Sequence, residues 1–156
     1  MSEVVLVERF PGVEDYLRLR KAAGMHSFSQ ACAVRGLPKT VYGVHLSRDG
    51  EVVAMGRVVG DGGCFFLIVD IAVAPELQGQ GLGKRIMGAL DAWLRANVPP
   101  SAYVSLVADG DAKYLYEKFG FVESAPVAVN MEYIMGVDGS KSTSHLDTSG
   151  KPARDH

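Results

Sequence analysis

The chain has 156 residues, of which 47% are hydrophobic and 22% charged, and its formal net charge at pH 7 is -2. This length fits one domain with its own core. The near-neutral balance argues against charge-driven binding to nucleic acid or to a membrane. No apolar run approaches the ~18 residues that would span a bilayer.

The start of the chain and its cysteines bear on the compartment. Residues 2–5 are acidic and apolar and lack the basic start of a secretory signal. The two cysteines, Cys32 and Cys64, have no metal-ligand spacing, so we expect reduced thiols and no metal site. These features together favour a cytoplasmic protein.

The first third of the chain alternates between the two hydrophobic periods. Residues 4–8 are predicted to form a short strand. A helix is predicted from Pro11 to residue 23, because proline is tolerated in a first helical turn, and Gly24 fits its C-terminal end. A second short helix is expected over residues 27–34.

The middle of the chain has the pattern of a sheet. Strands are predicted over residues 40–46 and 51–59, and Asp49-Gly50 between them is a strong hairpin signal. Residues 64–73 form an almost continuous apolar run, which is typical of a central strand buried on both faces.

The remainder continues the alternation and then changes character. A helix is predicted over residues 82–96, whose apolar side chains share one helical face. A buried strand over 102–108, a helix over 111–119 and one or two closing strands within 127–135 follow. Residues 137–156 are rich in Ser, Gly and Thr, so we expect an ordered domain over 1–136 and a disordered tail after it.

A glycine-rich turn joins the strand that ends near Val73 to the next helix, in the run VAPELQGQGLGKR. Unpaired N–H groups and a partial positive charge at a helix N-terminus can hold a phosphate. Glycines let the backbone approach that anion closely. The turn is therefore a candidate phosphate-binding loop.

The spacing in this turn rejects two well-known phosphate loops. A Walker A loop needs four residues between its glycine and Gly-Lys, but only three separate Gly79 from Gly83. A Rossmann fingerprint counted from Gly79 needs a third glycine where Lys84 stands. What remains is Gln78-x-x-Gly81-x-Gly83, or a turn that merely connects a strand and a helix.

This turn resembles the R/Q-x-x-G-x-G/A pyrophosphate loop of the GNAT superfamily of acetyl-CoA-dependent N-acetyltransferases. Downstream, the run DGDAKYLYEKFGF from Asp109 to Phe121 is similar to the family signature N-x-x-A-x-x-L-Y-x-K-x-G-F. The two motifs lie in the order that the family has. The resemblance covers about residues 3–135.

The resemblance implies an α/β (α+β) fold with one mixed, mostly antiparallel sheet that is flanked by helices and splayed at the acetyl-CoA site. The backbone of Ile71, Ala72 and Val73 would pair with the pantetheine arm. Backbone N–H groups would hold the pyrophosphate across Gln78, Gly79, Gln80, Gly81, Leu82, Gly83 and Lys84. Ala112 would also contact the cofactor. Asp109 stands where the family has Asn, and it cannot donate like an amide.

The implied reaction is direct attack of a neutral amine on the thioester, with no metal. Strand N–H groups near Val73 would stabilise the oxyanion. Tyr116 occupies the family's general-acid position and would protonate the departing thiolate. The alternative for Tyr116 is a packed aromatic side chain of an amphipathic helix.

Asp70 is a carboxylate within the apolar run, and burying it is costly unless it has a partner. Similar Asp residues stand here in several amine-acetylating relatives. We therefore expect Asp70 to attract the ammonium and receive its proton. The alternative is a structural salt bridge, with Arg57 on the adjacent strand as the obvious partner.

The acceptor amine is less defined by the sequence. His26 lies in the loop between the first two helices, which often borders the acceptor pocket in this family, and Phe28 and Tyr133 could line an apolar acceptor pocket. The leading hypothesis is acetylation of a small primary amine, arylalkylamine or polyamine-like. A protein or peptide acceptor, another acyl-CoA donor and a non-catalytic acetyl-CoA sensor remain alternatives. Relatives are often homodimers, so a dimer is possible.

Overall fold

The computed structural model describes residues 2–146. The chain divides after Val122 into two compact units, and each is described by itself. The first unit contains both sequence motifs and all five strands of the main sheet.

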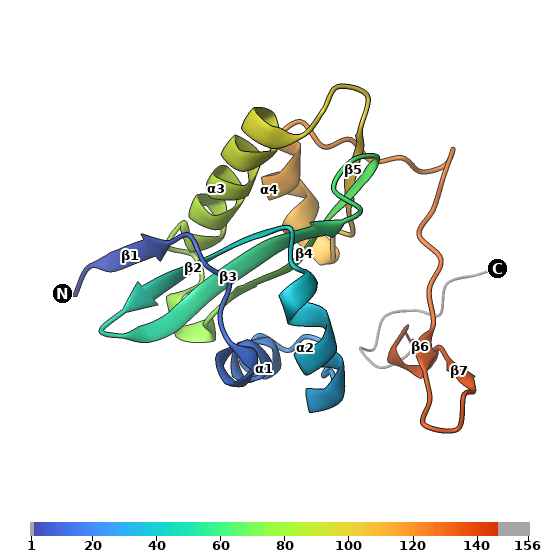
Figure 1. The fold of residues 1–156 in the computed structure, drawn as a ribbon, viewed down its shortest axis with the longest axis horizontal. Coiled ribbons are helices and arrows are strands. Elements are labelled where there is room, and N and C mark those ends of the chain that lie inside the picture. The colour runs from blue at the N-terminus through green and yellow to red at the C-terminus, as the bar shows by residue number, and fades with distance from the viewer. Residues whose placement is uncertain (1, 147–156) are drawn as a thin grey trace. The chain divides into compact units, whose positions relative to one another are not determined.

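The strands of the first unit form one sheet in the order β1-β2-β3-β4-β5 (Figure 1). Neighbouring strands are antiparallel from β1 to β4, and β5 pairs with β4 in parallel. The mixed, mostly antiparallel sheet that the sequence predicts is therefore confirmed. The strands are β1 (Val4–Val7), β2 (Tyr42–Arg48), β3 (Glu51–Gly60), β4 (Phe65–Val73) and β5 (Tyr103–Leu106).

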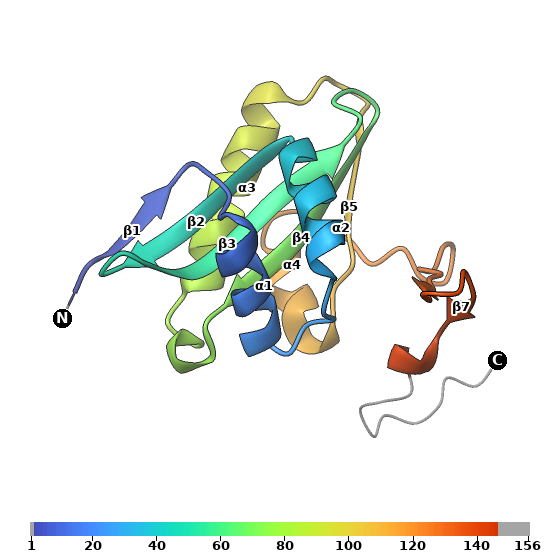
Figure 2. The same ribbon diagram turned by 60° about the horizontal axis from the view of Figure 1, so that its bottom comes forward.

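Helices cover both faces of this sheet. Figures 1 and 2 show α1 and α2 on one face and α3 and α4 on the other. Single 3-10 turns lie at Leu37–Lys39, Pro75–Leu77 and Gly110–Ala112. The helices are α1 (Val13–Ala22), α2 (Gln30–Gly36), α3 (Leu82–Asn97) and α4 (Lys113–Glu117).

The core lies between α3 and the sheet. Ile86, Met87 and Leu90 recur at helical spacing on one face of α3, and each is fully buried. They face the side of the central strands that carries Val44 and Leu46, which are fully buried too. Burying side chains of this size stabilises the fold by about 1.5–3 kcal/mol each, so α3 anchors the sheet.

A bulge interrupts the pairing of β3 with β4. Met55 faces Ala72 and Arg57 faces Val69, so Asp70 and Ile71 together stand opposite the single residue Gly56. Asp70 has a φ of 62°. A bulge bends its strand and redirects side chains, and here it lies in the half of β4 that extends beyond β5.

The predicted elements agree with the structure up to residue 119 within a few residues. The hairpin signal is confirmed, because Asp49 and Gly50 both have positive φ in the turn between β2 and β3. The second helix begins at Gln30 rather than at 27, since the Ser29 hydroxyl accepts a hydrogen bond from the Cys32 N–H and caps it there.

Two expectations about burial are wrong. The first half of β4 is not covered on both faces, since Phe65 is 63% exposed and Leu67 is 36% exposed. The strand β5 is also only half-buried, and Tyr103 on it is 60% exposed. β5 is the edge strand of the sheet, and an apolar run alone does not reveal which strand stands at an edge.

The second unit is described over residues 123–146. The closing strands expected within 127–135 are wrong for residues 127–133, which have no regular structure. Only β6 (Ile134–Met135) forms there, and it pairs with β7 (Lys141–Ser142), followed by a 3-10 turn at Ser144–Leu146. Of the tail expected over 137–156, residues 147–156 lie outside the described residues.

Replacing Gly56 by Ala should lower the free energy of unfolding by about 1–3 kcal/mol, measured by urea denaturation. A Cβ at Gly56 would lie 2.5 Å from Ile86 Cγ2 and 3.3 Å from Ile71 Cγ1. Gly88→Ala is the matched control, because nothing lies within 4 Å of its Cβ position in α3. That variant should gain up to about 1 kcal/mol from helix propensity. Equal effects of the two substitutions would contradict the close packing at Gly56.

Candidate active site

The two parallel strands of the sheet separate halfway along β4. Their pairing runs from Phe65 with Tyr103 to Ile68 with Leu106, where β5 ends. β4 continues to Val73 without a strand partner on that side among the described residues. Ile71, Ala72 and Val73 lie on this open stretch, so an extended ligand could pair with the backbone there as an added strand does.

The glycine-rich turn follows this open edge directly. After the 3-10 turn at Pro75–Leu77, Gly79 and Gly81 have φ values of 81° and 80°, which glycine adopts without strain. Nothing lies within 4 Å of the Cβ position of either glycine, so the loop leaves space at the backbone. Gln80, between them, is exposed.

The loop ends at the N-terminus of α3. Gly81 is the N-cap residue, and no side chain caps the helix. Because the first helical hydrogen bond runs from the Arg85 N–H to the Gly81 carbonyl, the N–H groups of Leu82, Gly83 and Lys84 have no partner within the helix. The structure thus brings these predicted residues together at a helix end that carries a partial positive charge, where an anion can bind.

Two residues link the loop to its surroundings. The Gln78 side-chain amide donates a hydrogen bond of 3.3 Å to the Val73 carbonyl, at the end of the open edge. The Cβ position of Gly83 lies 3.7 Å from Leu115 on α4 and 3.9 Å from Val73. The second motif is therefore packed beside the start of α3.

Tyr116 lies on α4 and is half-buried against the core. Burial raises the pKa of its hydroxyl above the ordinary value of 10, and the negative charge of Asp109 raises it further. Its hydroxyl makes no hydrogen bond to another described residue. Ala112, the N-cap residue of α4, lies between Asp109 and Tyr116 in the sequence. Tyr116 therefore keeps its proton at neutral pH, as a proton donor must.

Asp70 is held by three donors from two other elements. Its carboxylate accepts hydrogen bonds from Arg20 Nη1 at 2.7 Å, from Arg57 Nε at 2.6 Å and from the Tyr16 hydroxyl at 2.9 Å. The Asp70 side chain is only 3% exposed. The salt bridge with Arg57 that the sequence suggests is present, and Arg20 and Tyr16 complete it.

The contacts of Asp70 bear on its expected role as a base, which stays a prediction. Proton uptake by Asp70 would leave two buried guanidinium groups without their counter-charge, which is costly. Burial, and then the charge and hydrogen bond of Asp70, raise the pKa of Tyr16 to about 12. The geometry therefore describes a fixed ion-pair cluster in which donors occupy both carboxylate oxygens of Asp70.

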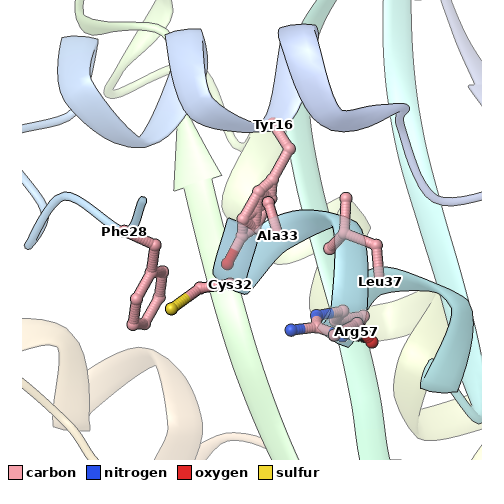
Figure 3. A pocket seen from close by; sticks show the side chains of 7 residues that line it. Tyr16, Phe28, Cys32, Ala33, Leu37 and Arg57 are labelled. Atoms are coloured by element: carbon pink, nitrogen blue, oxygen red, sulfur yellow. Dashed lines mark hydrogen bonds between the residues drawn. The ribbon is translucent and has the colours of Figure 1, made fainter. Parts of the chain in front are cut away.

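A cavity of about 210 Å³ lies against this cluster, between α1, α2 and β3. In Figure 3, Phe28 and Cys32 stand on one side of the group that lines it and Arg57 on the other. Its lining residues are Tyr16, Phe28, Cys32, Ala33, Gly36, Leu37 and Arg57.

Two of the three predicted acceptor-binding residues, His26 and Phe28, are in contact with each other. Phe28 lines the cavity. His26 packs edge-on against Phe28 at 5.1 Å between ring centroids, and its carbonyl accepts hydrogen bonds from Arg20. Tyr133 belongs to the second unit, where Lys141 Nζ lies 5.1 Å from its ring, and its role stays a prediction.

Sequence reasoning missed Tyr16 and Arg20. Both lie on α1, four residues apart, so the helix presents them on one face. Their partner Asp70 is more than 50 residues away along the chain. A signal was present, since buried Asp70 requires partners and one arginine on a neighbouring strand is seldom enough for a carboxylate with two oxygens.

Among residues 2–146 there is no group of three or more His, Cys, Asp or Glu side chains that could hold a metal ion. Within the same span, no helix is long and apolar enough to cross a membrane. Cys32 and Cys64 are both free thiols.

Comparisons with known proteins agree with the fold and the loop. The family model for the acetyltransferase (GNAT) domain matches residues 41–123. A probable acetyltransferase of unknown function from meticillin-resistant Staphylococcus aureus has a similar structure, with a TM-score of 0.80 and 41% identity over 83% of this chain and 98% of that one. A GNAT-family acetyltransferase from Streptococcus pneumoniae, 24% identical with a TM-score of 0.66, covers 86% of this chain and 98% of its own and shares the fold.

A curated relative gives the same family. An uncharacterized N-acetyltransferase from Pyropia yezoensis is 31% identical over 75 residues, and the match spans 48% of this chain and 42% of that protein. The chain therefore spans less than half of the length of the curated relative. Fold, motifs and comparisons together show that the chain belongs to the GNAT acetyltransferase family.

Replacing Gly81 by Val should weaken acetyl-CoA binding about ten- to a hundredfold, because a branched side chain would displace the backbone donors from the phosphate. Gly50→Val is a matched control, since Gly50 has a φ of 79° and nothing within 4 Å of its Cβ position. Both variants should lose similar stability from strain. Titration calorimetry with acetyl-CoA would contradict the loop assignment if both variants bound like the wild type.

Replacing Asp70 by Asn should lower the free energy of unfolding by about 3–5 kcal/mol, because Arg20 and Arg57 would keep buried charges without a carboxylate. Asp15→Asn is the control, since Asp15 pairs with Arg18 on the exposed side of α1. Its loss should stay below about 1 kcal/mol. Comparable midpoints of urea denaturation for the two variants would rule out the buried ion-pair cluster.

Proposed function

We propose that this protein is an N-acetyltransferase that moves the acetyl group of acetyl-CoA directly to the primary amine of a small molecule. The observation that carries the proposal is the open edge of β4 after its last pair with β5, at Leu106. The glycine loop and the uncapped start of α3 continue this edge. Together they offer backbone donors for an extended arm and for a pyrophosphate in one continuous path.

The residues of the loop fit the cofactor. Bound acetyl-CoA supplies the activated acetyl thioester. Backbone N–H groups from Gln78 to Lys84 would hold its pyrophosphate, and those of Ile71 to Val73 would align the arm and polarise the carbonyl. The open Cβ positions at Gly79 and Gly81 leave the close approach that such binding needs.

Tyr116 is proposed as the acid that protonates the departing thiolate. Burial raises the pKa of its hydroxyl above the ordinary value of 10, so the hydroxyl is protonated at neutral pH and can donate its proton. Besides burial, the negative charge of Asp109 raises this pKa. Asp109 stands where the family has Asn, and it affects the proposed acid through its charge.

A small acceptor is supported by the size of the cavity next to Asp70. About 210 Å³ lies below the ~300–1,000 Å³ typical of pockets for drug-sized ligands. The cavity lies beside the Asp70 cluster. Asp70 itself stands on β4, directly before the stretch proposed to hold the thioester arm. An amine in the cavity would therefore lie on the side of the sheet covered by α1 and α2.

The experiment that tests this function is acetyl-CoA-dependent thiol release with polyamines, arylalkylamines, amino acids, aminoglycosides and lysine peptides as acceptors. Turnover confined to small amines would support the proposal. Turnover on lysine peptides alone would replace the small acceptor by a protein. Binding of acetyl-CoA without turnover on any acceptor would indicate a sensor.

Replacing Tyr116 by Phe should lower kcat about 10²–10⁴-fold while leaving the acetyl-CoA Kd nearly unchanged. In the wild type, the alkaline fall in kcat caused by Tyr116 should lie above pH 10, because burial raises its pKa. Tyr114→Phe is the control on the same helix, since Tyr114 is 57% exposed, and it should retain full activity. Wild-type turnover by Tyr116→Phe would remove this residue from the acid role.

A further inference from the structure

The Asp70 cluster, which reaches the cavity through Arg57, carries an excess of positive charge. Two guanidinium groups, from Arg20 and Arg57, pair with the one carboxylate of Asp70. Among the described residues, neither arginine pairs with a second carboxylate. A buried excess charge favours an ion of opposite sign, since the surrounding protein screens it poorly.

The two arginines differ in what they have left to donate. Arg20 uses Nη1 for Asp70, and Nε and Nη2 for the His26 carbonyl. Its guanidinium also lies 4.4 Å from the Phe28 ring centroid, which fixes it further. Arg20 is therefore a structural member of the cluster.

Arg57 keeps one end of its guanidinium available. Nε donates to Asp70 at 2.6 Å, and Nη1 donates to Thr40 Oγ1 at 3.0 Å. Nη2 has no hydrogen-bond partner among the described residues, although the side chain is only 12% exposed. Arg57 lines the cavity, so Nη2 is free of acceptors from residues 2–146 and can donate to water or to a ligand.

We propose that the acceptor is a small amine that also bears a carboxylate, and that Arg57 Nη2 binds this carboxylate in the cavity. The inference rests on the proposed function in one respect, that the amine bound there receives the acetyl group. A guanidinium matches a carboxylate in shape and charge, and its hydrogen bonds to charged acceptors are stronger than neutral ones.

The same positive charge affects the reacting amine. A like charge nearby disfavours an ammonium and lowers its pKa. Anchoring the acceptor by its carboxylate therefore retains it while the amine becomes neutral more readily. An acceptor with only cationic groups, such as a polyamine, would meet repulsion instead.

Matched acceptor pairs test the proposal through kcat/KM. Phenylalanine is compared with 2-phenylethylamine, and 4-aminobutanoate with propylamine, so that the members of each pair differ by the carboxylate alone. The carboxylate member should be preferred about ten- to a hundredfold, mainly through KM. Phosphoethanolamine tests whether the site binds a phosphate instead of a carboxylate. A preference for it over both carboxylate acceptors would reassign the anion to phosphate. Equal or better use of the plain amines would overturn the proposal.

Arg57→Met should abolish the preference by raising KM for the carboxylate member alone. Because this substitution also removes a partner of Asp70, its fold is checked by urea denaturation and by the Kd for acetyl-CoA. Arg57→Lys keeps the charge but loses the planar donor pair, and it should retain part of the preference. An unchanged preference in a folded Arg57→Met would overturn the role of Arg57.

Cys32 provides a readout that does not depend on turnover. It lines the cavity, and the exposed Cys64 is the second cysteine of the chain, so Cys64→Ser isolates its reaction with iodoacetamide. N-acetylphenylalanine should slow alkylation of Cys32 at concentrations where N-acetyl-2-phenylethylamine does not. Equal protection, or none, would overturn the proposed site. Selective protection without turnover on any amine would contradict the proposed function and leave the anion site standing.

Discussion

The carboxylate of Asp70 is the point at which α1, β3 and β4 are tied together in the first unit. A charge in the middle of a sheet is tolerated only when its partners surround it, because leaving water costs several kcal/mol per ion. Tyr16 and Arg20 from α1 and Arg57 from β3 meet that requirement. The position of α1 on the sheet, and with it the wall of the cavity, follows from this one cluster.

The bulge at Asp70 lies directly beside the gap between β4 and β5. Two residues of β4 stand opposite Gly56, and the last pair with β5 lies just before them at Ile68 and Leu106. A bulged strand bends away from its regular course. Beyond the bulge, β4 runs on alone into the glycine loop, so a backbone irregularity and an open edge lie together where the donor is proposed to bind.

The charges of the cluster change the interpretation of the acceptor side. On the sequence alone, Asp70 is a negative group that could attract an ammonium. In the structure its two oxygens are occupied, and the charge that reaches the cavity belongs to Arg57. The net charge and the unused donors of a buried network decide which ligand it attracts. Here the net charge is positive, and the unused donor is a guanidinium N–H group.

Local sequence patterns predict the elements up to residue 119, the glycine loop and the family, because periodicity, turn residues and motif spacing act over short stretches of chain. Tertiary structure alone decided the partners of Asp70, the edge position of β5 and the absence of strands over 127–133. In that last segment Val127 and Met131 are largely exposed. Apolar residues of strand-like pattern form a strand only where another strand supplies hydrogen bonds and buries their side chains. No local sequence pattern specifies such long-range pairing.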